Sequence, residues 1–283
     1  MQGKFPGWLQ KKPINAEQVH NIKSLLRHLK VHTVCELARC PNIGECFSKP
    51  TATFMILGSR CTRGCKFCNI QRETPVHPDF EEPMNVADAT KVLGLKHVVV
   101  TSVTRDDLAD GGAYHFAATL HQIKKQNKNV TTEILIPDFL GSTKAIRTVM
   151  DAEPDILNHN VETVPRLYKQ IRCKANYERS LKLLRAAKRL SARIRTKSGL
   201  MLGLGEKEEE IISVMRDLHE VKCDILTIGQ YLQPSKDHIC VHEYIKPEDF
   251  LRYKEIALNM GFRHVESAPF VRSSYNAESV CRS

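Results

Sequence analysis

Apolar and polar residues alternate along this chain in blocks that predict strands and helices in turn. Continuous apolar runs, typical of strands buried on both faces of a parallel sheet, occur at Ala52–Leu57, His97–Val103, Thr132–Pro137, Ile156–Asn160, Gly199–Leu204, Ile225–Gly229 and Phe262–Ala268. Between the later runs, apolar residues recur at helical spacing in Ala113–Gln126, Tyr177–Leu190, Glu208–Glu220 and Pro247–Met260. Strands that alternate with helices predict βαβ units, and repeated crossovers of one hand close readily into a barrel.

The first part of the chain has a different pattern. An amphipathic helix is expected at Glu17–Lys30, and a cysteine-rich segment at 31–70 follows it, interrupted by the strand-like run Ala52–Leu57. No sequence repeat and no low-complexity linker divides the remainder. We therefore expect an α/β protein with one barrel-like domain and an N-terminal extension.

Composition limits the class of protein but does not identify its function. The 283 residues are 42% hydrophobic and contain no apolar run long enough for a transmembrane helix. The first residues lack the apolar stretch of a secretory signal, so we expect a cytoplasmic protein. With 42 basic and 32 acidic residues the net charge is +10, which favours an acidic partner. The densest basic stretch, Arg179–Lys197, is interpreted as the polar face of a helix.

Cysteines are the most informative residues. Six of the ten lie between positions 35 and 68. In a reducing compartment, clustered thiols bind metal more often than they form disulfides. The four later cysteines, Cys173, Cys223, Cys240 and Cys281, are scattered, and we expect them not to be ligands.

The first cysteine set is Cys61, Cys65 and Cys68, with the spacing C-x3-C-x2-C. Three thiolates on one short loop can hold an iron–sulfur cluster and leave one iron open. A structural zinc site normally has four ligands. The alternative is a zinc site that takes a distant histidine as its fourth ligand.

The second set is Cys35, Cys40 and Cys46, with the spacing C-x4-C-x5-C. One cluster needs at most four of the six residues, so the two sets predict two separate metal sites. The alternatives are a structural zinc at the second set, or one site shared by both sets.

The first set, with the aromatic Phe67 before its last cysteine, resembles the radical S-adenosylmethionine superfamily. The two cysteine sets together with the C-terminal R-S-S-Y at Arg272–Tyr275 resemble, within it, the lipoyl synthase family. Further matching runs are Thr51–Gly58, Thr104–Asp107, Asp110–Gly112, Pro154–Asn160 and Gly229–Pro234. The resemblance extends from about Trp8 to Tyr275.

This resemblance implies a partial (βα)6 TIM-type barrel at 49–265, between an auxiliary-cluster extension at 1–48 and a closing segment at 266–283. It implies an enzyme, a sulfurtransferase that inserts two sulfur atoms at C6 and C8 of an octanoyl chain in amide linkage to a lysine. The implied cofactors are S-adenosylmethionine (SAM) and two [4Fe–4S] clusters. SAM would be cleaved to a 5′-deoxyadenosyl radical, and the auxiliary cluster would donate its sulfide.

The family's functional residues are matched to this sequence as follows. Cys61, Cys65 and Cys68 would hold the radical cluster, and Cys35, Cys40, Cys46 and Ser274 the auxiliary cluster. Phe67, Gly111, Gly112, Asn158, Asn160, Glu162 and Gly203 would contact SAM. Arg272 would position a cluster or a carboxylate as a bidentate donor, and we expect it, Ser274 and the three radical-cluster cysteines to be the catalytic residues.

The same resemblance implies the partners. They are an octanoylated lipoyl carrier domain or glycine-cleavage carrier protein, a reductant of flavodoxin or ferredoxin type, and an iron–sulfur carrier that rebuilds the auxiliary cluster. No nucleic acid and no membrane is expected as a partner. A basic face could steer docking of an acidic carrier domain. The alternatives are another sulfur-inserting radical enzyme, or a non-enzymatic iron–sulfur or zinc protein.

Overall fold

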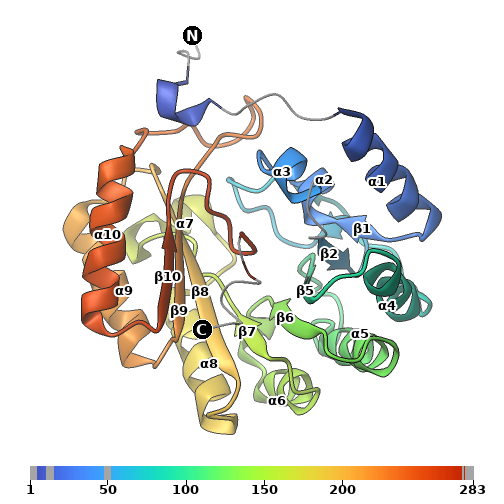
Figure 1. The fold of residues 1–283 in the computed structure, drawn as a ribbon. Helices are drawn as coiled ribbons and strands as arrows, with labels where there is room; N and C mark the ends of the chain where they lie inside the picture. Colours follow the sequence, from blue (N-terminus) through green and yellow to red (C-terminus); the bar gives the residue numbers. More distant parts are fainter. Residues whose placement is uncertain (1–4, 11–15, 48–51, 276, 278–283) are drawn as a thin grey trace.

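The computed structural model describes residues 5–10, 16–47, 52–275 and 277. Within them the main feature is an eight-stranded sheet in the order β1-β2-β5-β6-β7-β8-β9-β10 (Figure 1). Its strands are β1 (His32–Thr33), β2 (Thr53–Ile56), β5 (His97–Ser102), β6 (Thr131–Leu135), β7 (Ile156–Asn158), β8 (Arg195–Leu202), β9 (Ile225–Gln230) and β10 (His264–Ser267). Only β1 pairs antiparallel, with β2, and the other neighbours are parallel.

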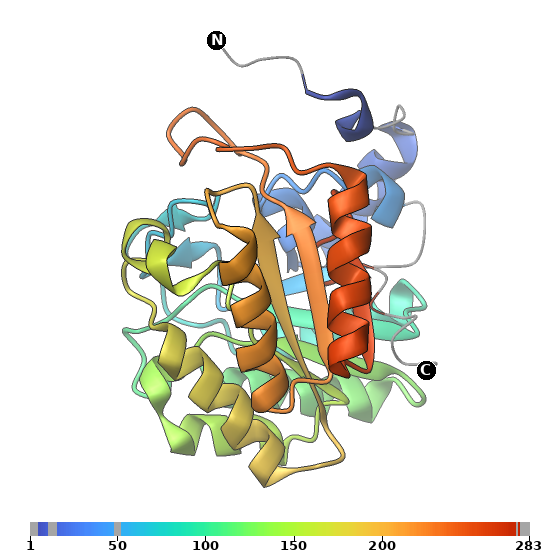
Figure 2. The ribbon, with the colours of Figure 1, turned by 90° about the vertical axis from the view of Figure 1, so that its left-hand side faces the viewer.

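Helices cover the outer face of the curved sheet (Figures 1 and 2). Each follows one strand: α4 (Glu82–Val92), α5 (Ala113–Gln126), α6 (Thr143–Asp151), α8 (Tyr177–Leu190), α9 (Glu208–Glu220) and α10 (Pro247–Met260). Six βα units therefore precede β10. Because β10 pairs with β9 alone and β1 with β2 alone, the sheet is an open arc. The expected partial (βα)6 barrel is confirmed.

The remaining elements lie at the two ends of the arc. The N-terminal part contains α1 (Ala16–His28), α2 (Val34–Leu37) and α3 (Ile43–Phe47), and the short pair β3 (Arg60–Cys61) and β4 (Gln71–Arg72) follows β2. Short helical turns are α7 (Tyr168–Ile171), Gly7–Leu9, Phe139–Gly141 and Pro165–Leu167. After β10 the chain turns inward across the arc toward α2 and α3 (Figure 1). This return brings R-S-S-Y to the N-terminal cysteines.

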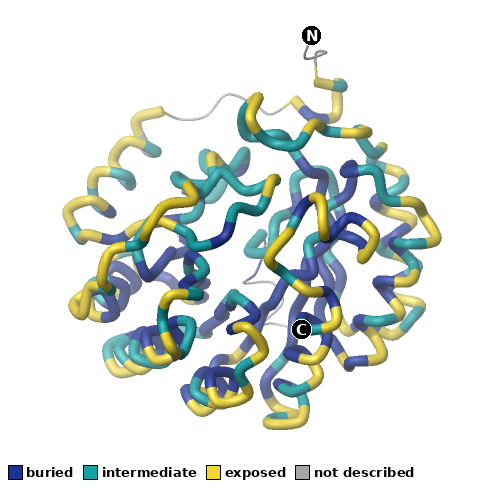
Figure 3. Tube along the Cα trace, turned by 180° about the vertical axis from the view of Figure 1, so that it is seen from behind, coloured by how far each residue is buried: buried dark blue, intermediate teal, exposed yellow. Residues whose placement is uncertain are grey.

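The elements form where local sequence and burial agree. In β5, Val98, Val99 and Val100 are all buried, as expected for a strand covered on both faces. In α8, apolar residues face the sheet, and the side chain of Asn176 caps the first turn by accepting from the Arg179 amide at 2.8 Å. Burial is concentrated along the strands and exposure along the outer helices (Figure 3). No helix in the described segments is long and apolar enough to cross a membrane.

The sequence pattern was wrong about the start of β8. The apolar run predicted a strand from Gly199, but the strand begins at Arg195. Lys197, assigned to the polar face of a helix, is instead buried in the sheet, where its ammonium lies 3.0 Å from both carboxylate oxygens of Glu133. A buried charge requires such a partner, and the partner lies on β6, outside any local window of sequence.

Candidate functional site

The first cysteine set lies on a loop at the carboxyl end of the sheet, which we call the radical loop (residues 60–72). Cys61 ends β3, and the pairing of β3 with β4 closes the base of the loop that carries Cys65 and Cys68. The amide and hydroxyl of Thr62 both donate to the Thr104 carbonyl, at 3.0 and 2.9 Å. Barrel enzymes build their active sites at this end of the strands.

Arg63 fixes the radical loop to two further strand ends. Its guanidinium is 5% exposed and donates to both carboxylate oxygens of Asp106, at 2.8 Å each, and to Asp138 at 2.6 Å. Arg179 on α8 donates to the other oxygen of Asp138 at 3.1 Å. Burial alone would raise the pKa of Asp138, but hydrogen bonds and charge from Arg63 lower it to about 2. The anchor is therefore fully ionised at neutral pH.

Two thiols of the radical loop, Cys65 and Cys68, ionise readily only beside a positive charge. Burial raises the pKa of Cys68 to about 12 and also raises the pKa of Cys65. Neighbouring cysteines add to both shifts because adjacent thiolates repel each other. A metal centre supplies the positive charge that thiolate ligands require. Together with Cys61 they give three thiols on one loop, which fit the donor set of an iron–sulfur cluster.

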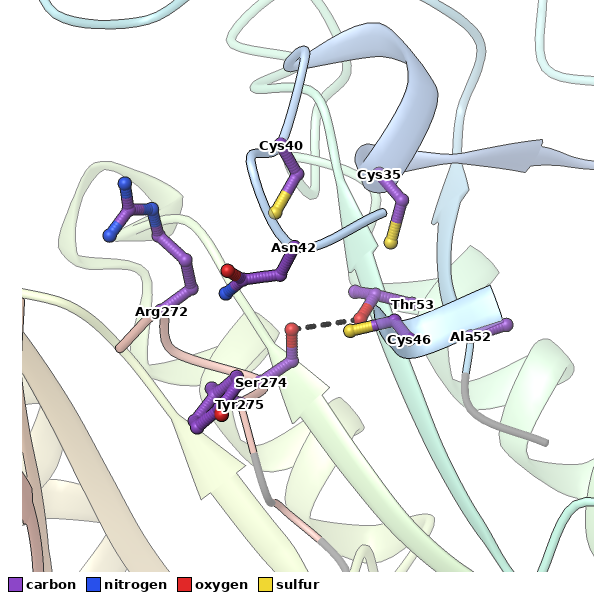
Figure 4. Close-up of a pocket in the computed structure, with 9 residues that line it drawn as sticks. All are labelled: Cys35, Cys40, Asn42, Cys46, Ala52, Thr53, Arg272, Ser274 and Tyr275. Carbon is purple, nitrogen blue, oxygen red and sulfur yellow. Dashed lines mark hydrogen bonds between the residues drawn. The ribbon is translucent and has the colours of Figure 1, made fainter. Parts of the chain in front are cut away.

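The second cysteine set lines a separate space, the auxiliary pocket, which has about 300 Å³ of empty volume that is partly open to solvent. Its lining residues are Cys35, Cys40, Asn42, Cys46, Ala52, Thr53, Arg272, Ser274 and Tyr275. The three thiols and the Ser274 hydroxyl point into the same space (Figure 4). The pocket joins α2, α3 and β2 to the segment that follows β10.

The structure distinguishes the two serines of R-S-S-Y. The Ser274 hydroxyl faces the thiols and accepts a hydrogen bond from the Thr53 hydroxyl at 2.9 Å (Figure 4). The Ser273 hydroxyl instead accepts from the Asn160 amide at 2.6 Å. Ser274 is thus the serine placed with the auxiliary cysteines. Its role as a ligand stays a prediction.

The charges around the auxiliary pocket suit an anionic group. Burial raises the pKa of Cys35 to about 12. Arg272 donates to the Val271 carbonyl at 2.7 Å, and burial lowers its pKa. In the described part of the chain, no carboxylate lies within ion-pair distance of Arg272. A cluster held by thiolates is a negative group that this buried cation would stabilise.

Buried polar atoms near the carboxyl ends of β5 and β7 define a second candidate ligand site, which we call the strand-end face. Ser102 Oγ, Asn160 Oδ1, Thr163 Oγ1 and Arg172 Nε are buried and have no hydrogen-bond partner among the described residues. Buried polar atoms are normally satisfied by protein, water or ligand. Glu162 lies in the same region, in a left-handed conformation (φ 66°), and burial raises its pKa. This face fits a polar cofactor such as SAM.

The structure gives less direct support for the other residues predicted to contact SAM. Gly112 is left-handed (φ 92°), and a Cβ there would lie 2.3 Å from Leu57 Cδ1. The amides of Gly111 and Gly112 already donate to Leu108 O and Asp110 Oδ1, at 3.0 and 2.9 Å. Ligand contact through their amides would therefore require these bonds to break. Phe67, next to Cys68, is partly buried against the core.

Two further residues predicted to contact SAM, Asn158 and Gly203, pack against other residues of the protein. Asn158, the last residue of β7, is fully buried and its amide donates to Glu133 at 2.9 Å, while its Oδ1 has no hydrogen-bond partner among the described residues. A Cβ on Gly203 would lie 2.2 Å from Gln230 Nε2 and 2.4 Å from the Glu243 carbonyl. Packing of the protein therefore already requires glycine at 203. Roles of both residues in cofactor binding stay predictions.

Sequence reasoning missed the charged residues that fix the radical loop. Arg63 lies inside the cysteine motif, Asp106 inside the matched run Thr104–Asp107, and Asp138 shortly after a predicted strand. A basic residue within the loop and acidic residues just past strand ends were the sequence features that could have predicted this anchor.

The four later cysteines do not gather at either site. Cys223 is buried, Cys173 and Cys240 are exposed, and Cys281 lies outside the described residues. Across the segments the structure describes, no three or more His, Cys, Asp or Glu side chains are placed to hold a single metal ion.

Comparison with known proteins agrees with this geometry. The model of the radical SAM superfamily matches residues 55–218. The chain is 56% identical to the lipoyl synthase of Caldanaerobacter subterraneus subsp. tengcongensis over 96% of this chain and 95% of that protein. It is also 56% identical to the lipoyl synthase of Caldicellulosiruptor saccharolyticus over 100% of this chain and 99% of that protein.

Solved structures share the fold at low sequence identity. Methylornithine synthase PylB is 14% identical, with a TM-score of 0.56 over 95% of this chain and 88% of that one. The FeFe-hydrogenase maturase HydG from Carboxydothermus hydrogenoformans is 12% identical, with a TM-score of 0.58 over 95% and 78%. With its open barrel and two cysteine sites, the chain belongs to the lipoyl synthase family of the radical SAM superfamily.

Proposed function

We propose that this protein completes the lipoyl group by inserting sulfur at C6 and C8 of an octanoyl chain carried on a protein lysine. The observation that carries the proposal is the auxiliary pocket, where three thiols and Ser274 converge at the mouth of a radical SAM barrel. A radical enzyme needs only the radical loop to cleave SAM. A second, separate set of cysteines is what a sulfur donor requires.

When bound, a cluster on the radical loop supplies the electron that cleaves SAM, and a cluster in the auxiliary pocket supplies the sulfur. Cys61, Cys65 and Cys68 would hold the first of these. Arg63 keeps their loop in place through its two carboxylate partners.

Ser274 has a distinct task in the auxiliary pocket. An alkoxide is a harder ligand than a thiolate and suits an iron–sulfur cluster less well, so the iron at Ser274 would be the one most easily released. The hydrogen bond from Thr53 holds the hydroxyl toward the thiols. Arg272 would balance the negative charge of the thiolates.

The two cysteine loops also contact each other. Asn69 of the radical loop donates to the Leu37 carbonyl of α2 at 2.8 Å. The radical loop therefore lies against the helix that carries Cys35. A substrate chain bound between the two cysteine sets would meet the hydrogen-abstracting group and the sulfur source in one bound position.

The partners follow from the proposed chemistry. The substrate is carried by a lipoyl carrier domain or glycine-cleavage carrier protein, a flavodoxin or ferredoxin would deliver the electron, and an iron–sulfur carrier would restore the auxiliary cluster. The net charge of +10 supports steering of an acidic carrier domain. Activity that falls with rising salt is expected, and a flat salt response would remove the steering argument.

The proposal is tested by removing each cysteine set in turn. The variant Cys35→Ala, Cys40→Ala, Cys46→Ala should keep about half of the iron and still cleave SAM, but form no lipoyl product. The variant Cys61→Ala, Cys65→Ala, Cys68→Ala should lose SAM cleavage and keep the other half. Iron and sulfide are measured anaerobically, and products by mass spectrometry. Loss of SAM cleavage in both variants, or zinc in place of iron, would refute the division of roles.

A further inference from the structure

One hydrogen bond connects the two candidate ligand sites through side chains. The amide of Asn160, two residues beyond the end of β7, donates to the Ser273 hydroxyl at 2.6 Å. Ser273 precedes Ser274, whose hydroxyl points into the auxiliary pocket (Figure 4). The bond therefore joins the polar strand-end face to the residue next to the predicted auxiliary ligand.

Asn160 is held tightly, yet retains an unused acceptor. It is 6% exposed, and its amide also donates to Glu162 at 3.1 Å. Its carbonyl oxygen Oδ1 is buried without a hydrogen-bond partner in the described segments. A Cβ on the neighbouring Gly199 would lie 2.8 Å from this oxygen, so the space that Asn160 occupies exists because residue 199 is glycine. A ligand that donates to Oδ1 would act on the same carboxamide that binds Ser273.

The backbone that precedes Ser273 is fixed against the carboxyl end of β9 and against the N-terminal part. The Gln230 amide donates to the Pro269 carbonyl at 3.2 Å, and Asn42 donates to the Phe270 carbonyl at 2.7 Å. A Cβ on Gly229 would lie 2.1 Å from the Val271 carbonyl oxygen. The segment is packed too closely for free rotation, so a shift of Ser273 would be transmitted to Ser274.

We propose that Ser273 is a positioning residue that couples the two sites, with Asn160 as its partner. This inference rests on the proposed function. Through the Asn160 carboxamide, Ser273 sets the orientation of Ser274 toward the auxiliary thiols. A ligand bound at the strand-end face stabilises that orientation, and by thermodynamic reciprocity an ordered auxiliary site favours that ligand.

The parent protein for this test is the variant in which Cys61, Cys65 and Cys68 are alanine, so that only iron bound at the auxiliary site is observed. Within it, Ser273→Ala should shift the Mössbauer spectrum toward that of Ser274→Ala. Iron loss to excess chelator should become about five-fold faster, as loss of one neutral hydrogen bond implies. Ser273→Thr keeps the hydroxyl and should keep the parent spectrum.

Ser267→Ala is the matched control. Ser267 is also buried in the C-terminal part, where its hydroxyl donates to the Phe250 carbonyl at 2.7 Å, but it faces neither site. This variant should retain the parent spectrum and rate of iron loss. Identical spectra for Ser273→Ala and Ser267→Ala would overturn the coupling while leaving the proposed function intact. A parent that binds no iron would refute the auxiliary site itself.

A second arm uses the chain with both cysteine sets and measures SAM binding by calorimetry. Ser273→Ala should weaken the binding of SAM several-fold, whereas Ser267→Ala should leave SAM affinity unchanged. If Ser273→Ala does not yield folded protein, Gly199→Ala replaces it in both arms, because its added Cβ would press on Asn160 Oδ1, at 2.8 Å, as well as on Thr227 Oγ1, at 2.9 Å. Unchanged SAM affinity together with an unchanged auxiliary spectrum would overturn the proposal.

Discussion

The two cysteine sites of this protein are held in place by different forces. The radical loop is anchored by Arg63, a buried cation with hydrogen bonds of 2.6 to 2.8 Å to Asp106 and Asp138. The auxiliary site is held to a segment more than 200 positions away in sequence by hydrogen bonds without a buried arginine: the neutral bonds of Asn42 with Phe270 and Thr53 with Ser274, and one from the Tyr275 hydroxyl to the Glu45 carboxylate at 3.0 Å. One site is part of the barrel, and the other is assembled when the C-terminal segment returns.

This difference matches the tasks proposed for the two sites. A centre that only transfers an electron benefits from a rigid frame, because its geometry must be the same in every turnover. A centre that gives up sulfur must be opened and rebuilt. A neutral hydrogen bond contributes about 1 kcal/mol and one to a charged group about 1.5–3 kcal/mol, whereas breaking a buried ion pair costs about 3–5 kcal/mol. The auxiliary site is therefore the easier of the two to open.

The largest effect is expected for Arg63→Ala, which leaves two carboxylates without their shared cation. The free energy of unfolding should fall by about 3–5 kcal/mol, and the radical loop should lose its iron. Arg60 on the same loop is the control, because its ion pair with Glu73 is about half exposed on both sides. Arg60→Ala should change stability by less than about 1 kcal/mol in urea unfolding. Equal losses for the two variants would contradict the anchor.

Acid should weaken the radical loop's anchor within a defined pH window. The folded pKa of Asp138 is about 2, below its ordinary value of 3.8. A carboxyl group with a lowered folded pKa stabilises the fold above its unfolded pKa, and this contribution disappears as pH falls through the folded value. About 2 kcal/mol should therefore be lost between about pH 4 and pH 2.

The comparison with Asp138→Asn isolates this contribution. The difference in unfolding free energy between wild type and variant should shrink across the same window, as followed by urea unfolding at each pH. The subtraction removes other acidic groups such as Glu133, whose pKa is also lowered. A difference that stays constant with pH would show that Asp138 is not the titrating anchor.

The smallest effect is expected for Asn42→Ala, which removes one hydrogen bond to the Phe270 carbonyl. Amide hydrogen exchange in residues 270–275 should become about five-fold faster, as expected for about 1 kcal/mol. Exchange in the radical loop should not change. Asn69→Ala removes a similar bond, from the radical loop to Leu37, and should leave residues 270–275 at the wild-type rate. If both variants loosen both regions, the two sites are not held independently.

Much of the fold was determined by local sequence. The helices Ala113–Gln126, Tyr177–Leu190, Glu208–Glu220 and Pro247–Met260 have the bounds that their apolar spacing predicts. The exceptions are instructive. Strand β8 begins earlier than its apolar run because Lys197 is neutralised by Glu133 on another strand. Helices α4 and α6 were not singled out, although their buried residues complete the outer layer.

By itself the sequence determined the strand and helix alternation, the two cysteine sets and the family they resemble, because periodicity and spacing are local properties. The tertiary structure decided which serine faces the thiols, which carboxylates bind Arg63, and that Asn160 joins the strand ends to the R-S-S-Y segment. These contacts span 43 to 221 positions of sequence. Such pairings depend on how a curved sheet brings its strand ends and chain ends together, and no local pattern encodes that geometry.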